Sequence, residues 1–69
     1  MLNGFKAARI IAGLTQAEVA DKLGVSTVAV CHWESGKTFP RVNRIHEVAD
    51  VLNTTVEQLL KHYEIKEVS

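Results

Sequence analysis

The sequence predicts an all-α fold, a compact five-helix bundle in a single domain that spans residues 1–69. Apolar residues recur every three or four positions along the chain, which is the spacing of amphipathic helices. No stretch alternates apolar and polar residues, and no Asn-Gly or Asp-Gly pair marks a hairpin. With 46% hydrophobic and 23% charged residues, the composition is typical of a folded globular domain with one small core.

The composition also restricts where the protein works. A lone cysteine, Cys31, excludes an intramolecular disulfide, the staple that secreted domains of this size usually need. No apolar run approaches the ~20 residues of a membrane helix, and the first residues lack the pattern of a signal peptide. We therefore expect a cytoplasmic protein without a membrane partner.

The first helix is predicted over residues 2–12, because its apolar residues share one face. These residues are Leu2, Phe5, Ala8 and Ala12. Gly13 follows, and glycine takes the left-handed conformation that ends many helices.

Two start signals close together predict the second and third helices. Thr15 and Glu18 match a capping box, and Ser26 is a second capping residue. Gly24 ends the second helix, so only Val25 separates the two elements. Helices joined by so short a turn cannot lie antiparallel and cross steeply, which is helix-turn-helix geometry. The predicted spans are 16–23 and 27–34.

Two further helices are predicted after a loop that contains Gly36 and Pro40. Asn53 can take the left-handed conformation between them, and Thr55 with Gln58 matches another capping box. The apolar faces consist of Val42, Ile45, Val48, Ala49 and Leu52, and of Val56, Leu59, Leu60 and Tyr63. The predicted spans are 42–52 and 56–63, followed by a tail at 64–69.

Charge is distributed unevenly although the net charge is zero. Residues 1–44 carry six Lys or Arg and three Asp or Glu, a net charge of +3, whereas residues 45–69 carry two and five, a net charge of −3. A basic front would orient the molecule toward a polyanion. Chance segregation of solvated charges is the alternative interpretation.

The run from Leu14 to Ser26, LTQAEVADKLGVS, is followed by Val30, by Trp33-Glu34-Ser35-Gly36-Lys37 and by Pro40. This pattern resembles the phage-repressor-type (Xre) helix-turn-helix family, and the resemblance covers roughly residues 5–60. It implies a lambda-repressor-like DNA-binding domain, with the helix-turn-helix at helices 2–3 and the third helix in the major groove of double-stranded DNA.

The resemblance also implies roles for individual residues. Arg9 and Glu34 correspond to an internal ion pair that links the first helix to the end of the third. The base-reading positions are Ser26, Thr27, Val28 and His32. The backbone-contacting positions are Gln16, Lys37, Thr38 and Arg41, with Arg44 as a weaker candidate.

Elementary chemistry agrees with several of these roles. Gln16 places an amide beside the free N–H groups of a helix start, which suits a phosphate. Val28 offers apolar surface that suits a thymine methyl, provided that it is not packed against the domain.

Two consecutive isoleucines after Arg9 cannot both face the core, so we expect Ile11 at the surface.

Catalytic and metal sites are not predicted. Cys31 and His32 are adjacent and point about 100° apart on a helix, and no Cys-x-x-Cys or His-x-x-x-His spacing occurs. Trp33 falls on the inward face rather than on a base-stacking platform. We therefore expect no enzymatic activity, no metal and no cofactor.

The predicted function is that of a sequence-specific DNA-binding transcriptional regulator, a dimeric repressor or autoregulator of a near-palindromic operator. Relatives dimerise around the junction of the fourth and fifth helices, which nominates Val51, Asn53, Val56 and Tyr63. The alternative is a protein-interaction module, such as an antitoxin or accessory subunit. The neutral total charge and the apolar Ile11, Val28 and Val51 favour that alternative.

Overall fold

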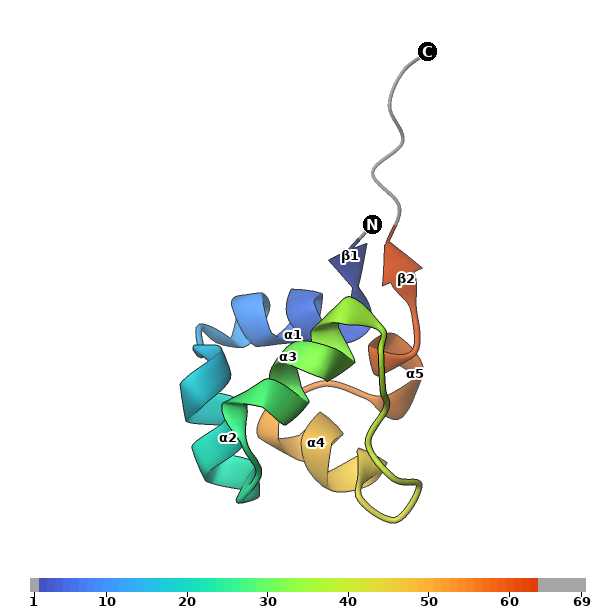
Figure 1. The fold of residues 1–69 in the computed structure, drawn as a ribbon. Helices are drawn as coiled ribbons and strands as arrows, with labels where there is room; N and C mark the ends of the chain where they lie inside the picture. Colours follow the sequence, from blue (N-terminus) through green and yellow to red (C-terminus); the bar gives the residue numbers. More distant parts are fainter. Residues whose placement is uncertain (1, 64–69) are drawn as a thin grey trace.

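Five helices surround one apolar core in the computed structural model, which describes residues 2–63 (Figure 1). The all-α, five-helix fold is therefore confirmed, with one short pair of strands added to it. In chain order the elements are β1 (Leu2–Asn3), α1 (Gly4–Ala12), α2 (Gln16–Leu23), α3 (Thr27–Ser35), α4 (Ile45–Val51), α5 (Val56–Leu59) and β2 (His62–Tyr63). None of these helices is long and apolar enough to cross a membrane.

The predicted caps determine where the central helices begin and end. Thr15 Oγ1 accepts from the backbone amide of Glu18 at 3.1 Å, and Glu18 Oε1 accepts from the amide of Thr15 at 2.9 Å, so the capping box is complete. Ser26 Oγ accepts from the amide of Ala29 at 3.1 Å. Gly24 ends α2 with a φ of 67°, a conformation in which other residues are strained. Residue choice at the caps thus fixes the short connection between α2 and α3.

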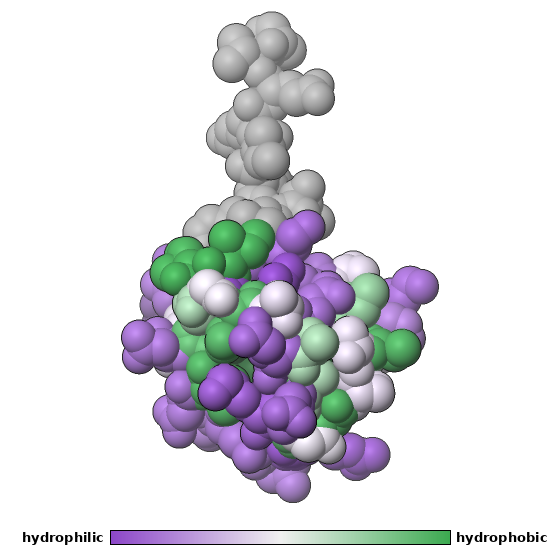
Figure 2. All heavy atoms as spheres, turned by 90° about the vertical axis from the view of Figure 1, so that its left-hand side faces the viewer, coloured by the Kyte–Doolittle hydropathy of each residue, from purple (hydrophilic) through white to green (hydrophobic). Residues whose placement is uncertain are grey.

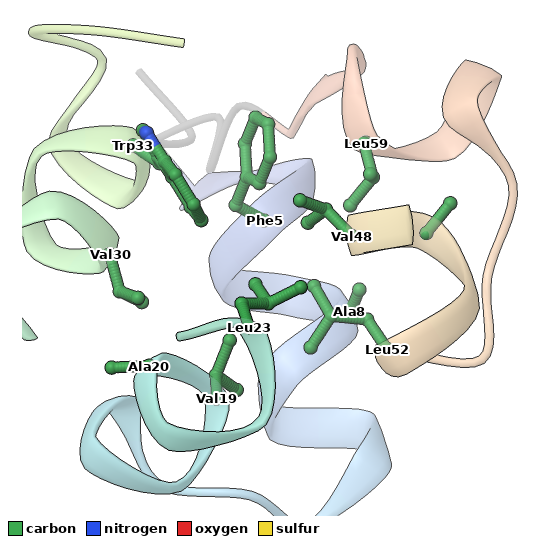
Figure 3. Packing of buried hydrophobic residues seen from close by; sticks show 11 residues of the cluster. Phe5, Ala8, Val19, Ala20, Leu23, Val30, Trp33, Val48, Leu52 and Leu59 are labelled. Carbon is green, nitrogen blue, oxygen red and sulfur yellow. The ribbon is translucent and has the colours of Figure 1, made fainter. Parts of the chain in front are cut away.

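The core draws side chains from all five helices. Phe5 lies at its centre in Figure 3, with Trp33 on one side and Val48 and Leu59 on the other. The ring centroids of Phe5 and Trp33 are 6.1 Å apart, within the range of favourable aromatic pairs. The buried apolar residues are Phe5, Ala8, Val19, Ala20, Leu23, Val30, Trp33, Val48, Ala49, Leu52 and Leu59.

The predicted first helix begins two residues too early. Asn3 has extended φ and ψ and caps α1 from outside, because its Oδ1 accepts from the amide of Lys6 at 3.0 Å. Its Nδ2 also donates to the Trp33 carbonyl at 2.7 Å, which ties the buried Asn3 to α3. Leu2 and Asn3 therefore belong to β1, which pairs antiparallel with β2. Figure 1 shows the two strands side by side at the top of the molecule.

The predicted bounds of the last two helices are also too wide. The fourth helix begins at Ile45 rather than at residue 42, because the Arg41 carbonyl accepts from the Arg44 amide at 2.8 Å and closes a turn there. Val42, expected on the buried face, is 88% exposed. The fifth helix ends at Leu59 rather than at residue 63, because the chain straightens to pair with β1.

Gly4 permits a close approach between α1 and α5. Its amide donates to the Lys61 carbonyl at 2.8 Å. A Cβ at this position would lie 2.0 Å from the Gln58 carbonyl oxygen and 2.6 Å from that of Leu59. The backbone of α5 therefore leaves no space for any side chain at residue 4.

We predict that Gly4→Ala lowers the free energy of unfolding by about 3 kcal/mol or more, the upper end of the cost of overpacking, because the clashing atoms are backbone. Gly13→Ala is the matched control, since its φ is 74° but no atom lies within 4 Å of the place where a Cβ would stand. Its expected cost is about 1–2 kcal/mol, from the left-handed backbone alone. Urea unfolding of both variants tests this, and equal losses would contradict the close approach.

The capping box should make stability depend on pH. The Thr15 backbone amide and then the Thr15 side chain hydrogen-bond the Glu18 carboxylate, and they lower the pKa of Glu18 below its ordinary value. A folded-state pKa below the unfolded one stabilises the protein above the unfolded pKa, and this contribution disappears as the pH falls through the folded pKa. We therefore expect Glu18→Ala to be less stable than the unsubstituted protein near neutral pH.

The difference in urea midpoint between the two proteins should shrink between about pH 5 and about pH 3 as Glu18 is protonated. A difference that stays constant over this range would show that the ionised carboxylate does not hold the start of α2.

Candidate nucleic-acid interface

The steep crossing of α2 and α3 exposes the outer side of α3, which lies across the front of the molecule in Figure 1. The Val25 amide donates to the Ala20 carbonyl at 3.0 Å, which closes the turn between the helices. Ala20 is buried, and its small side chain lets the helices approach. The hydrogen-bonded turn therefore holds α3 at a fixed angle to α2.

Side chains on α3 face either the core or solvent, with Ala29 and His32 partly buried between them. Val30 and Trp33 are buried, whereas Thr27 and Val28 are exposed at the first turn. Val28 is 61% exposed, so the interpretation in which it packs against the domain is wrong. Ser26 is also exposed, and His32 is half-buried one turn after Val28. Three of the four residues expected to read bases are thus exposed at the start of α3, and the fourth, His32, is half-buried one turn further along.

A hydrogen-bonded network connects α1, α3 and the start of α2. The carboxylate of Glu34 accepts from Arg9 Nε at 2.5 Å and from Arg9 Nη2 at 3.2 Å, which is the ion pair that the resemblance implies. The side chain of Glu34 is only 5% exposed. Arg9 Nη1 also donates to the Leu14 carbonyl at 2.9 Å, just before α2. A bidentate ion pair with additional hydrogen bonds is the arrangement that offsets the desolvation of buried charges.

Gln16 belongs to the same network. Its Nε2 donates to Glu34 Oε1 at 3.1 Å. A side-chain amide carries two N–H groups, so one remains for a ligand while the other is held by the carboxylate. Glu34 therefore orients the amide at the first position of α2, where the free backbone N–H groups of the helix favour an anion.

The loop after α3 is anchored at its start and in its middle. The amides of Lys37 and Thr38 donate to the His32 carbonyl at 3.0 and 3.4 Å. The ring of Phe39 is 53% exposed but lies 6.1 Å from that of the buried Phe5, so the middle of the loop contacts the edge of the core. Lys37, Thr38 and Arg41 are all exposed on this loop. These contacts place Lys37 and Thr38 beside the end of α3, whereas Arg41 lies in the turn that leads into α4.

Arg44 is engaged within the protein. Its Nη2 donates to the Leu23 carbonyl at 2.6 Å, and its Nε and Nη2 donate to Glu47 Oε1 at 3.0 and 2.9 Å. These contacts join α4 to the end of α2. They favour a structural role for Arg44 over the contact with a DNA phosphate suggested by the resemblance.

The remaining cations of the front half are available to a polyanion. Among the side chains that the structure describes, the ion pairs are Arg9 with Glu34 and Arg44 with Glu47. Lys37 and Arg41 are exposed and lie outside both pairs.

In the described part of the chain, no three His, Cys, Asp or Glu residues are grouped as a metal site would require.

Sequence reasoning missed three residues beside the interface. Lys6, Cys31 and Ser35 line a hollow of about 200 Å³ together with Gln16 and Glu34. Helical spacing contained a partial signal, because Lys6 precedes Arg9 by one turn and Cys31 precedes Ser35 by one turn. This spacing does not show that the two pairs lie close together. They are brought together by the packing of α1 against α3 through Arg9 and Glu34.

The residues nominated for dimerisation lie around the junction of α4 and α5. Val51 and Val56 are half-buried against the core, and Asn53 is exposed with a φ of 53°, the left-handed conformation expected of it. The side chain of Tyr63 lies outside the described part of the structure. The nomination of this surface stays a prediction.

Exposed apolar residues also occur on α1. Ile11 is 86% exposed, as expected, and Ile10 is 54% exposed. Figure 2, which views the molecule from the left-hand side of Figure 1, shows a mostly hydrophilic face with hydrophobic atoms gathered toward its upper left edge.

Comparison with known proteins supports the sequence resemblance. Residues 5–59 match the model of a helix-turn-helix family. The HTH-type transcriptional activator BcrR of Enterococcus faecalis is 35% identical over 52 residues, which cover 75% of this chain and 26% of that protein. The cryptic phage CTXphi transcriptional repressor RstR of Vibrio cholerae serotype O1 is 33% identical over 45 residues, which cover 65% of this chain and 40% of that protein.

The chain thus spans between about a quarter and two fifths of the length of these two relatives. No solved structure matches it. The family match extends from Phe5 through Leu59, and so includes the capping box, the α2–α3 turn and the anchored loop. The chain belongs to the Xre-type helix-turn-helix family.

Proposed function

We propose that this chain binds double-stranded DNA in a sequence-specific manner and regulates transcription by occupying an operator. The observation that carries the proposal is the exposed edge of α3, held at a steep angle to α2 and flanked by the available cations of the anchored loop. The names of BcrR and RstR describe transcriptional regulators, which supports the same function. In this proposal the chain is not an enzyme, and it acts where the chromosome lies, in the cytoplasm.

Contacts with the DNA backbone would set the orientation of the protein. The oriented amide of Gln16 would donate to a phosphate at the start of α2. Lys37, Thr38 and Arg41 would contact phosphates on the other side of α3. Contacts from two separate elements, the start of α2 and the loop after α3, would hold the first turn of α3 at a fixed depth in the major groove.

Base recognition would come from the exposed residues of α3. The hydroxyl of Ser26 accepts the capping hydrogen bond but keeps its own proton for donation. Thr27 can donate, accept or offer a methyl group, and Val28 provides apolar contact for a thymine methyl. His32, one turn later, would read a neighbouring base. Short side chains of this kind require α3 to approach the bases closely.

We further propose a dimer on DNA. Four residues read few base pairs, so a second copy bound one helical turn away, about 34 Å along the duplex, would supply the missing specificity. Two-fold symmetry would then make the operator near-palindromic. The surface around Val51, Asn53, Val56 and Tyr63 is the candidate contact. Repression or autoregulation would follow from occupancy alone.

Selection of random duplex DNA by the purified protein at physiological salt tests the function directly. We expect sequencing of the retained pool to show two inverted half-sites. A single enriched half-site would contradict the dimer but retain DNA recognition. A pool that matches the unselected DNA, with protein shown to be folded by circular dichroism, would contradict the proposal.

The roles assigned to α3 and to the loop predict different effects of substitution. His32→Ala should change the selected sequence at one position per half-site, because a base contact discriminates by about 1–3 kcal/mol. Lys37→Ala should weaken binding to all sequences and lower the slope of log affinity against log salt by about 1. Lys61→Ala is the matched control, an exposed lysine just after α5 and outside the helix-turn-helix. Equal losses that do not depend on salt would contradict the division of roles.

A second candidate function is contact with another protein, which the exposure of Ile10 and Ile11 favours. Apolar residues that cluster at a surface mark interaction sites more often than scattered ones do. This function is compatible with DNA binding, because Ile10 and Ile11 are not among the residues proposed to contact DNA. It becomes the leading hypothesis if the selection experiment retains no specific DNA.

A further inference from the structure

We propose that the hollow between α1, α2 and α3 receives a backbone phosphate of the bound duplex and that Lys6 supplies its positive charge. This inference rests on the proposed function and extends the DNA footprint to α1, a helix outside the helix-turn-helix. Its basis is the hollow of about 200 Å³ that brings Lys6, Gln16, Cys31, Glu34 and Ser35 together. Such a space is several times the roughly 30 Å³ of a water molecule, so it can admit a phosphate group.

The net charge of the hollow favours an anion. Glu34 is the acidic residue of the lining, and its carboxylate is already paired with Arg9. Lys6 is exposed and takes part in neither of the ion pairs formed by the described side chains. The charge of the Arg9–Glu34 pair is balanced, so the ammonium of Lys6 is the uncompensated charge in the hollow. A phosphodiester that enters it would be attracted rather than repelled.

The polar groups of the lining can contribute as well. Gln16 Nε2 donates one hydrogen to Glu34 Oε1, and its second hydrogen is available to a phosphate oxygen. Ser35 Oγ donates to the His32 carbonyl at 3.1 Å and therefore has no proton to give to an anion. Cys31 is exposed and adds a weak S–H donor to the wall. Lys6 and Gln16 are thus the two groups that would hold the phosphate.

The position of the hollow along α3 matches the width of the groove. Val28 lies in the first turn of α3, and Ser35 is its last residue. Seven residues of helix rise about 10.5 Å. The major groove is about 12 Å wide. With the first turn at the base edges, the end of α3 would be far enough along the helix axis to approach the sugar-phosphate backbone, and the hollow beside Ser35 would face that strand.

Salt-dependent binding of the selected duplex tests the charge of Lys6. Lys6→Gln should weaken binding about two- to fivefold, as expected for an exposed ion pair, and lower the salt slope by about 1. The selected sequence should stay the same, because a phosphate contact does not read bases. Lys61→Gln, the same change after α5, should alter neither quantity. A Lys6→Gln protein with the salt slope of the unsubstituted chain would overturn the inference.

Neutralising single phosphates on the DNA locates the contact. Duplexes that carry one methylphosphonate at each backbone position in turn should reveal one position where neutralisation weakens binding of the unsubstituted protein more than it weakens binding of Lys6→Gln, in which only Gln16 still holds that phosphate. If the effect of the methylphosphonate and the effect of Lys6→Gln on the binding free energy simply add at every position, Lys6 contacts no particular phosphate and the inference is overturned. Thermal unfolding of Lys6→Gln verifies that the fold is intact.

The two proposals fail in different ways. If the unsubstituted protein selects no DNA, both fail together. If it selects a specific operator but Lys6→Gln and Lys61→Gln bind it equally well at every salt concentration, only the proposed phosphate site fails. Lys6→Glu supplies a second measurement, since charge reversal should weaken binding more than Lys6→Gln does if a phosphate occupies the hollow.

Discussion

The arrangement of the candidate interface depends on the hydrogen bonds that the buried carboxylate of Glu34 accepts. It is almost fully buried, and it binds Arg9 of α1 and Gln16 of α2 from its own position near the end of α3. Three helices are therefore held to one charged group. Removing one partner of such a buried pair typically costs about 3–5 kcal/mol, because the other charge is left without compensation. The same contacts set the direction of the Gln16 amide, so stability and the geometry of the proposed DNA contact would share one network.

A second constraint comes from the ends of the described chain. Gly4 lets α1 touch the backbone of α5, and Asn3 bonds both the start of α1 and the Trp33 carbonyl. The antiparallel pairing of β1 with β2 closes the bundle from the same side. In a domain this small the core alone gives limited stability, so hydrogen bonds that bring the two ends of the bundle together matter more than in a larger protein. They also fix α1, and with it Arg9 and Lys6, against α3.

Local signals in the sequence predicted most of the fold. Thr15 with Glu18, Ser26 and the glycines at 13, 24 and 36 act within a few residues of chain, so their spacing alone specified the starts and ends of α1, α2 and α3 to within two residues. The two-residue strands show no alternation over so short a length, and Gly4 serves a contact with residues more than 50 positions away. Lys6 joined the candidate site only through the packing of α1 on α3. What the sequence did not reveal was thus tertiary in origin.

The short side chains of the reading helix explain why so much of the interface is devoted to positioning. Thr27 and Val28 extend only a few bonds from the backbone, so a small displacement of α3 would remove them from the base edges altogether. Longer polar side chains would tolerate such displacement by changing rotamer. In this chain a rigid scaffold must instead prevent such displacement of α3. The scaffold consists of the capped α2–α3 turn, the Arg9–Glu34–Gln16 network and the loop that contacts the core through Phe39. Specificity would therefore depend as much on residues that never touch a base as on the few that do.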